Sequence, residues 1–135
     1  MYDMQHCGSD AQIPAVKDDS KQGPIPQVWR PVFRAIVMAF MKGDFKLSAG
    51  VPGVSPVSDA VAGRIEACVN EYGETLTELP EETWTSSVCI WNGDRWDALI
   101  DLWTSAGGRS DLVMQAFVTE SACGFDYEIH MVYVP

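Results

Sequence analysis

The stretch DRWDALIDLW, residues 94–103, decides the fold because it fits two secondary structures. A helix capped by Asp94 would align four apolar side chains at the i, i+3, i+4 and i+7 positions. A strand would instead point Trp96 to one face of a sheet and Trp103 to the other. Asn-Gly precedes the stretch and Gly-Gly follows it, and both pairs are hairpin signals. We therefore predict a strand, with the helix as the alternative.

Three further apolar segments accompany this one in the second half of the chain. The four segments are SSVCIW, WDALIDLWT, LVMQAFVTE and FDYEIHMVYVP, joined by NGD, SAGGRS and SACG. Such short connectors favour antiparallel neighbours, because a parallel pair needs a crossover of about a dozen residues or more. The pattern predicts a four-stranded antiparallel meander.

Two helices are predicted before the meander. Apolar residues recur at helical spacing over residues 28–42, and Gly43 is suited to end that helix. A second apolar stripe begins after Ser55 or Ser58, either of which is a suitable cap, and Gly73 supplies its stop. The predicted fold is therefore α+β, with two N-terminal helices packed on one face of the sheet.

The chain of 135 residues predicts one domain. Residues 1–24 are polar and lack apolar periodicity, so we predict a flexible tail followed by a single domain over residues 25–135. No apolar run approaches the roughly 20 residues that span a bilayer. The start of the chain lacks a secretory signal, so the expected compartment is the cytoplasm, without membrane association.

Four cysteines have spacings that match no C-x-x-C metal or redox motif. They are Cys7, Cys68, Cys89 and Cys123. Two disulfides are possible in number, but free buried thiols are expected in a reducing compartment.

Charge is distributed unevenly along the chain. The net charge is −10, which excludes nucleic acid as a favoured partner because phosphate binding depends on lysine and arginine. Residues 66–135 contain thirteen acidic residues but only Arg95 and Arg109 as bases. This half of the chain is suited to steer a basic protein partner, although an acidic surface also serves solubility.

Catalytic chemistry has few candidates. On the last predicted strand, Asp126, Glu128 and His130 share a face, so Glu128 and His130 are two of the three ligands that a catalytic zinc would need. Simple alternation of a strand also predicts this polar face, and we expect no metal and no cofactor there. Carboxylate pairs are too abundant to indicate acid–base catalysis.

The segment GGRSDL is a second candidate site. Its glycines expose backbone amides that suit an anion, but the segment lacks the lysine and spacing of a P-loop. A hairpin turn in which Arg109 pairs with a nearby acid is the preferred interpretation of this segment. Enzymatic activity therefore stays open, with a non-enzyme favoured.

Two sets of residues follow from the strand prediction, which also pairs Trp91 with a buried Trp96. The first is a partner-binding patch on the uncovered face of the sheet: Trp103, Asp97, Asp101, Leu99, Phe117 or Val113, Asp126 and Glu128. Aromatic anchors within a charged rim are typical of protein-binding surfaces. The second set would line a pocket for a small ligand or substrate: Trp91, Trp96, Arg109 and His130. A homodimer that buries the uncovered face is the third interpretation.

Six motifs resemble those of a small bacterial domain family without an assigned activity. They are KGDF, YGETL, LPEETW, W-x-x-L-x-DLWT, GRSDLV and VYVP, and they extend over about residues 28–135. The resemblance implies a compact α+β domain and carries over no catalytic residues. Small acidic bacterial domains of this kind are similar to immunity proteins, which block a toxin made by the same cell. We therefore expect a protein-binding module with a basic, toxin-like partner.

Overall fold

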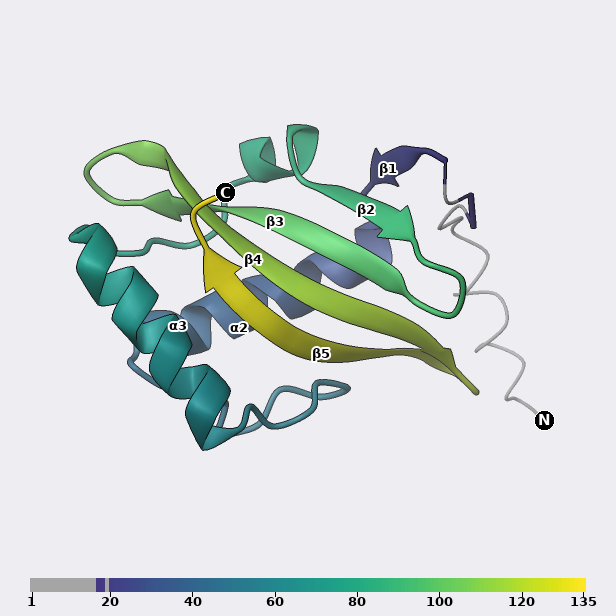
Figure 1. Cartoon of the computed structure of the whole chain (residues 1–135), viewed down its shortest axis with the longest axis horizontal. Coiled ribbons are helices and arrows are strands. Elements are labelled where there is room, and N and C mark those ends of the chain that lie inside the picture. Colours follow the sequence, from purple (N-terminus) through teal and green to yellow (C-terminus); the bar gives the residue numbers. More distant parts are fainter. Residues whose placement is uncertain (1–16, 19) are drawn as a thin grey trace.

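One antiparallel sheet organises the molecule (Figure 1). The computed structural model describes residues 17, 18 and 20–135. The sheet has the order β1-β2-β3-β4-β5, and each strand neighbours the next along the chain. The bounds are β1 Gln22–Pro24, β2 Val88–Trp91, β3 Trp96–Thr104, β4 Gly108–Ser121 and β5 Gly124–Tyr133. The predicted antiparallel meander is confirmed as β2 to β5, and β1 adds a fifth strand.

Strand β1 lies within the segment predicted to be a tail. Most of residues 1–24 lie outside the described residues, but Gln22–Pro24 pair with β2, with Gly23 opposite Cys89. Three residues without apolar alternation carry no recognisable strand signal, and their partner is more than sixty residues away. The tail prediction therefore does not hold for these three residues.

The stretch that fits two structures forms a strand. Along β3 every second residue is buried, from Trp96 to Thr104, and the residues between them are partly exposed. The preceding hairpin is closed by a hydrogen bond from the Asn92 amide to the Arg95 carbonyl, at 2.7 Å. Gly93 occupies the left-handed region in this turn, with φ of 89°. Because β3 is paired on both sides, sheet formation prevails over its helical periodicity.

Both predicted helices form. The first starts as a short 3₁₀ turn, η1 (Gln27–Trp29), and continues as α2 (Arg30–Met41). The second, α3 (Asp59–Tyr72), starts at Ser58, whose hydroxyl accepts a hydrogen bond from the Val61 amide, and ends at Gly73 with φ of 84°. A 3₁₀ segment, η2 (Glu81–Thr85), precedes β2. In the described part of the chain, no helix is long and apolar enough to cross a bilayer.

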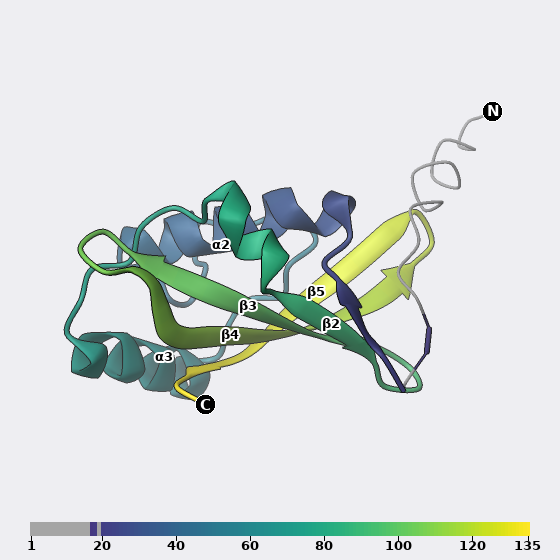
Figure 2. The same ribbon diagram turned by 90° about the horizontal axis from the view of Figure 1, so that it is seen from above.

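Helix α2 covers one face of the sheet, which we call the inner face. Its residues are Trp96, Ala98, Ile100, Leu102, Leu112, Met114, Ala116, Val118, Tyr127, Ile129 and Val132, all buried. The Trp29 and Trp96 rings meet edge to face at 5.4 Å, and Phe33 of α2 meets Tyr127 of β5 at 5.8 Å. Figure 2 shows α2 running alongside the strands, while α3 lies against β5. This packing confirms the predicted α+β class and leaves the opposite face of the sheet without a helix like α2.

An irregularity in β4 connects the sheet to α3. The pairing of β3 with β4 shifts between Asp101 and Trp103, so Ser110 to Leu112 lie opposite Leu102. The Ser110 hydroxyl donates to the Leu102 carbonyl at 2.8 Å and accepts from the Leu112 amide at 3.0 Å. The Asp111 amide donates to the Tyr72 hydroxyl at 3.1 Å. Side chains thus satisfy the backbone groups that the ladder leaves unpaired.

Three of the four cysteines belong to the described residues, and Cys7 lies outside them. Cys68 on α3 and Cys89 on β2 are free thiols as predicted, but only Cys89 is fully buried. Cys123, in the exposed turn between β4 and β5, is disulfide-bonded, so the prediction of a free buried thiol is wrong there. Composition alone does not distinguish an exposed turn cysteine, which another sulfur can reach, from a buried one.

Two buried ionisable side chains are expected to lower the stability of the fold at alkaline pH. Burial raises the pKa of the Tyr127 hydroxyl from 10.0 to about 12 and that of the Cys89 thiol from 9.0 to about 11. Above pH 9 to 10 the unfolded chain releases these protons first, so stability falls as the pH rises toward the folded pKa values. Each group accounts for a loss of about 2 to 3 kcal/mol at about 1.4 kcal/mol per pKa unit. Urea unfolding between pH 8.5 and 11.5 tests this prediction.

Tyr127→Phe provides the matched variant for that experiment. It removes the hydroxyl but keeps the ring that packs on Phe33, so its stability should fall less steeply than that of the parent chain above pH 10. Parallel curves for the two proteins would contradict the assignment to Tyr127.

Candidate functional site

The face of the sheet opposite α2 gathers the residues predicted to bind a partner. We call it the outer face and define it by the outward residues of β3 to β5. They are Asp97, Leu99, Asp101, Trp103, Val113, Gln115, Phe117, Asp126, Glu128, Met131 and Tyr133. The register places Phe117 between Asp97 on one side and Glu128 on the other. Every residue of the predicted patch therefore lies on one face of the folded chain.

The register also decides between two alternatives for β4. Val113 pairs with Asp101, and Phe117 pairs with Asp97. Both therefore point to the outer face, with Gln115 between them opposite Leu99. Alternation along a continuous strand places both apolar side chains beside a carboxylate.

A bulge in β5 changes which side chains of the last strand share a face, so the predicted faces are wrong beyond it. Strict alternation places Phe125, Tyr127, Ile129, Met131 and Tyr133 on one face. Gln115 pairs with Met131 but Ala116 pairs with Ile129, which leaves His130 as the extra residue. Beyond the bulge the pattern inverts, so Val132 is buried and Met131 is exposed on the outer face. The run Met131-Val132-Tyr133 was the available signal, since three consecutive apolar residues do not alternate.

Arg95 is a residue of this face that the sequence did not identify. Its guanidinium lies 3.6 Å from the centre of the Phe117 ring, and the His130 ring lies 4.7 Å from the same centre. Arg95 Nε and Asp97 Oδ1 are 3.5 Å apart, and both atoms are shielded from solvent without a hydrogen-bond partner. The cation–π contact therefore positions Arg95 better than its long ion pair does.

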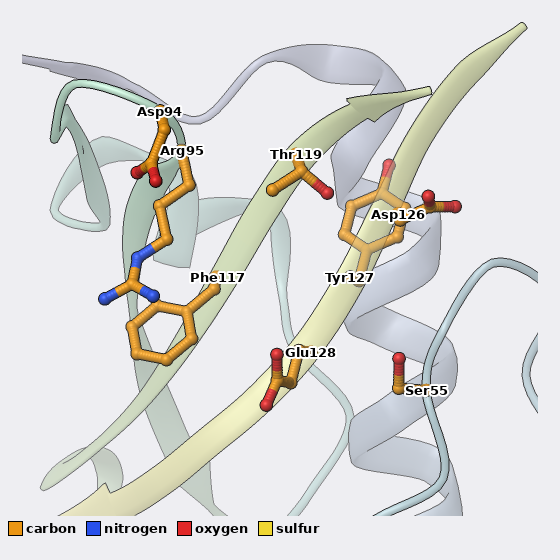
Figure 3. Close-up of a pocket in the computed structure, with 8 residues that line it drawn as sticks. All are labelled: Ser55, Asp94, Arg95, Phe117, Thr119, Asp126, Tyr127 and Glu128. Atoms are coloured by element: carbon orange, nitrogen blue, oxygen red, sulfur yellow. The ribbon is translucent and has the colours of Figure 1, made fainter. Parts of the chain in front are cut away.

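A small pocket opens beside this stack. Figure 3 shows Arg95 and Phe117 on one side and the β5 side chains on the other, with Thr119 between them. Its volume is about 220 Å³. The lining residues are Ser55, Asp94, Arg95, Phe117, Thr119, Asp126, Tyr127 and Glu128. Three acidic residues and one arginine thus line this space, and the Phe117 ring forms one of its walls.

Asp101 is held at the other end of the outer face. Its backbone amide donates to the Ser87 hydroxyl at 3.0 Å, and its carbonyl accepts from the Thr83 hydroxyl at 2.7 Å. The Ser86 hydroxyl donates to its carboxylate. The segment of η2 and the two residues after it therefore hydrogen-bonds to β3 where β2 no longer pairs with it. These bonds fix the position of the Asp101 carboxylate.

Trp103 lies next to Asp101 on the outer face, but it is only partly exposed. Its indole nitrogen is shielded and has no hydrogen-bond partner among the described residues. Arg109 is its partner across the β3–β4 hairpin and forms no ion pair within the described residues. The predicted pairing of Arg109 with an acid therefore does not form.

The residues of the alternative pocket do not converge. Trp91 and Trp96 meet at 4.7 Å at the start of β3. Arg109 pairs with Trp103, seven residues along the strand from Trp96, which corresponds to about 23 Å. His130 is exposed on the outer face. Arg109 and His130 line two different cavities.

Metal ligands do not gather in the described residues either, where no group of three or more His, Cys, Asp or Glu side chains has the geometry to hold an ion. The His130 ring packs against the Phe117 ring, with the ring centres 4.7 Å apart.

Comparison with known proteins gives a family. The model of the family described as "Domain of unknown function (DUF7668)" matches residues 37–135, so the chain belongs to this family. No curated protein and no solved structure matches the chain. The match includes α3 and strands β2 to β5, and therefore the whole outer face.

Proposed function

We propose that this member of the DUF7668 family is a protein-binding module whose outer face binds a basic protein surface. The observation that supports the proposal is the placement of carboxylates beside apolar side chains on one uncovered sheet face. Asp97 and Glu128 flank Phe117 across the strands, and Asp101 lies beside Val113. Aromatic anchors with a charged rim are typical of binding patches.

The electrostatic field of the chain supports a basic partner. Strands β2 to β5 come from the half of the chain with thirteen acidic residues and two basic ones. Of these two, Arg95 is already engaged with Phe117 and Asp97. An excess of one charge on a face raises association rates with an oppositely charged partner by about 10- to 1,000-fold at low salt.

The same charges disfavour a homodimer through this face. A two-fold interface places the same patch of both copies together. Four carboxylates from each copy, those of Asp97, Asp101, Asp126 and Glu128, would then meet with few bases to neutralise them. A foreign basic partner satisfies these groups, whereas a second copy does not. A toxin made by the same cell is the partner class that the similarity to immunity proteins suggests.

Photocrosslinking tests the proposal directly. A photoreactive phenylalanine analogue at Leu99, in the middle of the outer face, should capture one basic protein in the producing cells. The same analogue at Glu66, exposed on α3, is the control. The captured protein, once purified, should bind the unmodified chain with an association rate that falls as salt rises from 50 to 300 mM.

Two outcomes would contradict the proposal. Equal capture from both positions would show that the outer face has no special role. Capture of a second copy of the chain at Leu99 would assign the face to self-association, which light scattering would confirm as a dimer in solution.

A further inference from the structure

The pocket beside Arg95 and Phe117 indicates which group of a partner the outer face recognises. We infer that it accepts the guanidinium or ammonium group of one basic side chain, and that Arg95 competes for this position within the free chain. The inference rests on the proposed function and adds the chemical class of the anchoring residue. It also assigns Arg95 a role in tuning affinity.

The size of the pocket limits its occupant. Pockets for drug-sized ligands have volumes of about 300 to 1,000 Å³. This one measures about 220 Å³ and lies open on a sheet face. A single side chain that reaches in from a docked protein fits this volume better than a free cofactor or a nucleotide does.

The lining favours a cation, because it has three acidic residues and one base, Arg95. Asp94, Asp126 and Glu128 form no ion pair within the described residues. The Thr119 hydroxyl and the Phe117 ring complete the wall. A guanidinium suits such a place because it binds carboxylates in a bidentate manner and stacks on aromatic rings.

Arg95 shows that the aromatic wall accepts a guanidinium. Its Cζ lies 3.6 Å from the centre of the Phe117 ring, within the range of a close cation–π contact. The ion pair with Asp97 is long at 3.5 Å and leaves Arg95 Nε without a hydrogen bond. The stacked Arg95 guanidinium occupies this wall and repels a second cation, so its removal should strengthen binding of an external one.

A single-residue probe tests this without a known partner. Nα-acetyl-L-arginine amide is titrated into the ¹⁵N-labelled full chain and followed by NMR, with the neutral citrulline analogue in parallel. We expect saturable shifts in the millimolar range at the amides of Arg95, Phe117, Thr119 and Glu128, and none with citrulline. Arg95→Gln should bind the arginine probe at least threefold more tightly.

Matched charge variants separate the pocket from general attraction. The double variant Asp126→Asn/Glu128→Gln should weaken probe binding at least fivefold. The control variant Glu66→Gln/Asp111→Asn removes two charges outside the pocket. It should change the affinity for the arginine probe less than twofold. Circular dichroism checks that each variant is folded.

Three results would overturn the inference. They are weaker binding by Arg95→Gln, equal weakening by the two double variants, and shifts centred on Trp103 instead of Phe117. None of them bears on capture at Leu99, so the proposed function would stand if the pocket assignment failed. Conversely, the arginine probe could bind in the pocket while Leu99 captures no protein. The pocket would then be a cation site, and the proposed protein-binding function would be wrong.

Discussion

Replacing Trp96 with alanine is expected to lower the free energy of unfolding by about 3 to 5 kcal/mol, the largest effect we predict for a single substitution. Trp96 is 1% exposed and is the first residue of β3. Its ring meets Trp29 at 5.4 Å, Trp91 at 4.7 Å and Phe125 at 6.0 Å. The variant would leave a cavity where η1 meets the sheet, because none of these rings can extend into the space of an indole. Urea unfolding followed by circular dichroism measures the loss.

Trp96→Phe is the graded control. It keeps an aromatic ring and should lose less stability than the alanine variant. A loss below about 0.5 kcal/mol for Trp96→Ala, the range typical of surface substitutions, would show that this cluster does not hold the N-terminal turn to the sheet.

Replacing Trp103 with alanine should instead affect the partner. The side chain lies on the outer face next to Asp101 and is partly exposed, as anchors of a binding patch are. Loss of an aromatic anchor costs about 2 kcal/mol or more in binding, which is about a 30-fold loss of affinity. Isothermal titration with the protein captured at Leu99 measures this change. Because Trp103 also packs against the core, we expect a smaller loss of stability than for Trp96→Ala.

Trp91→Ala is the matched control for that experiment. Trp91 is also a partly buried tryptophan, but it packs on Trp96 at the inner side of the sheet. It should lose stability and keep its affinity for the partner. If both variants lost affinity equally, the binding surface would include the inner edge of the sheet, and the outer face would not be the sole contact.

The sequence predicts the fold well where patterns are local. Alternation along residues 96–104 and the Asn-Gly turn before it identify β3, and Ser58 and Gly73 mark the ends of α3. Strand β1 has no such pattern, because its pairing with Cys89 depends on a segment far along the chain. For the bulge at His130 the sequence offers only the non-alternating run Met131-Val132-Tyr133, and its position is set by the register with β4.

The candidate site is predicted in outline and not in detail. A period of two places Asp97, Asp101 and Phe117 on one face, which the register confirms. Arg95 is different, because its contact is with an aromatic ring twenty-two residues further along the chain. Only the hairpin register brings the two together. A lone arginine at the start of a strand gives no indication of this in the sequence.

The borders of the sheet have a consequence for how the chain associates. Strand β1 ends in Pro24, which lacks an amide hydrogen, and β5 has α3 against it. Neither border offers a long row of free backbone groups on which another strand could build. A short border that ends in proline on one side and a helix beside the border on the other are features with which natural sheets resist edge-to-edge association.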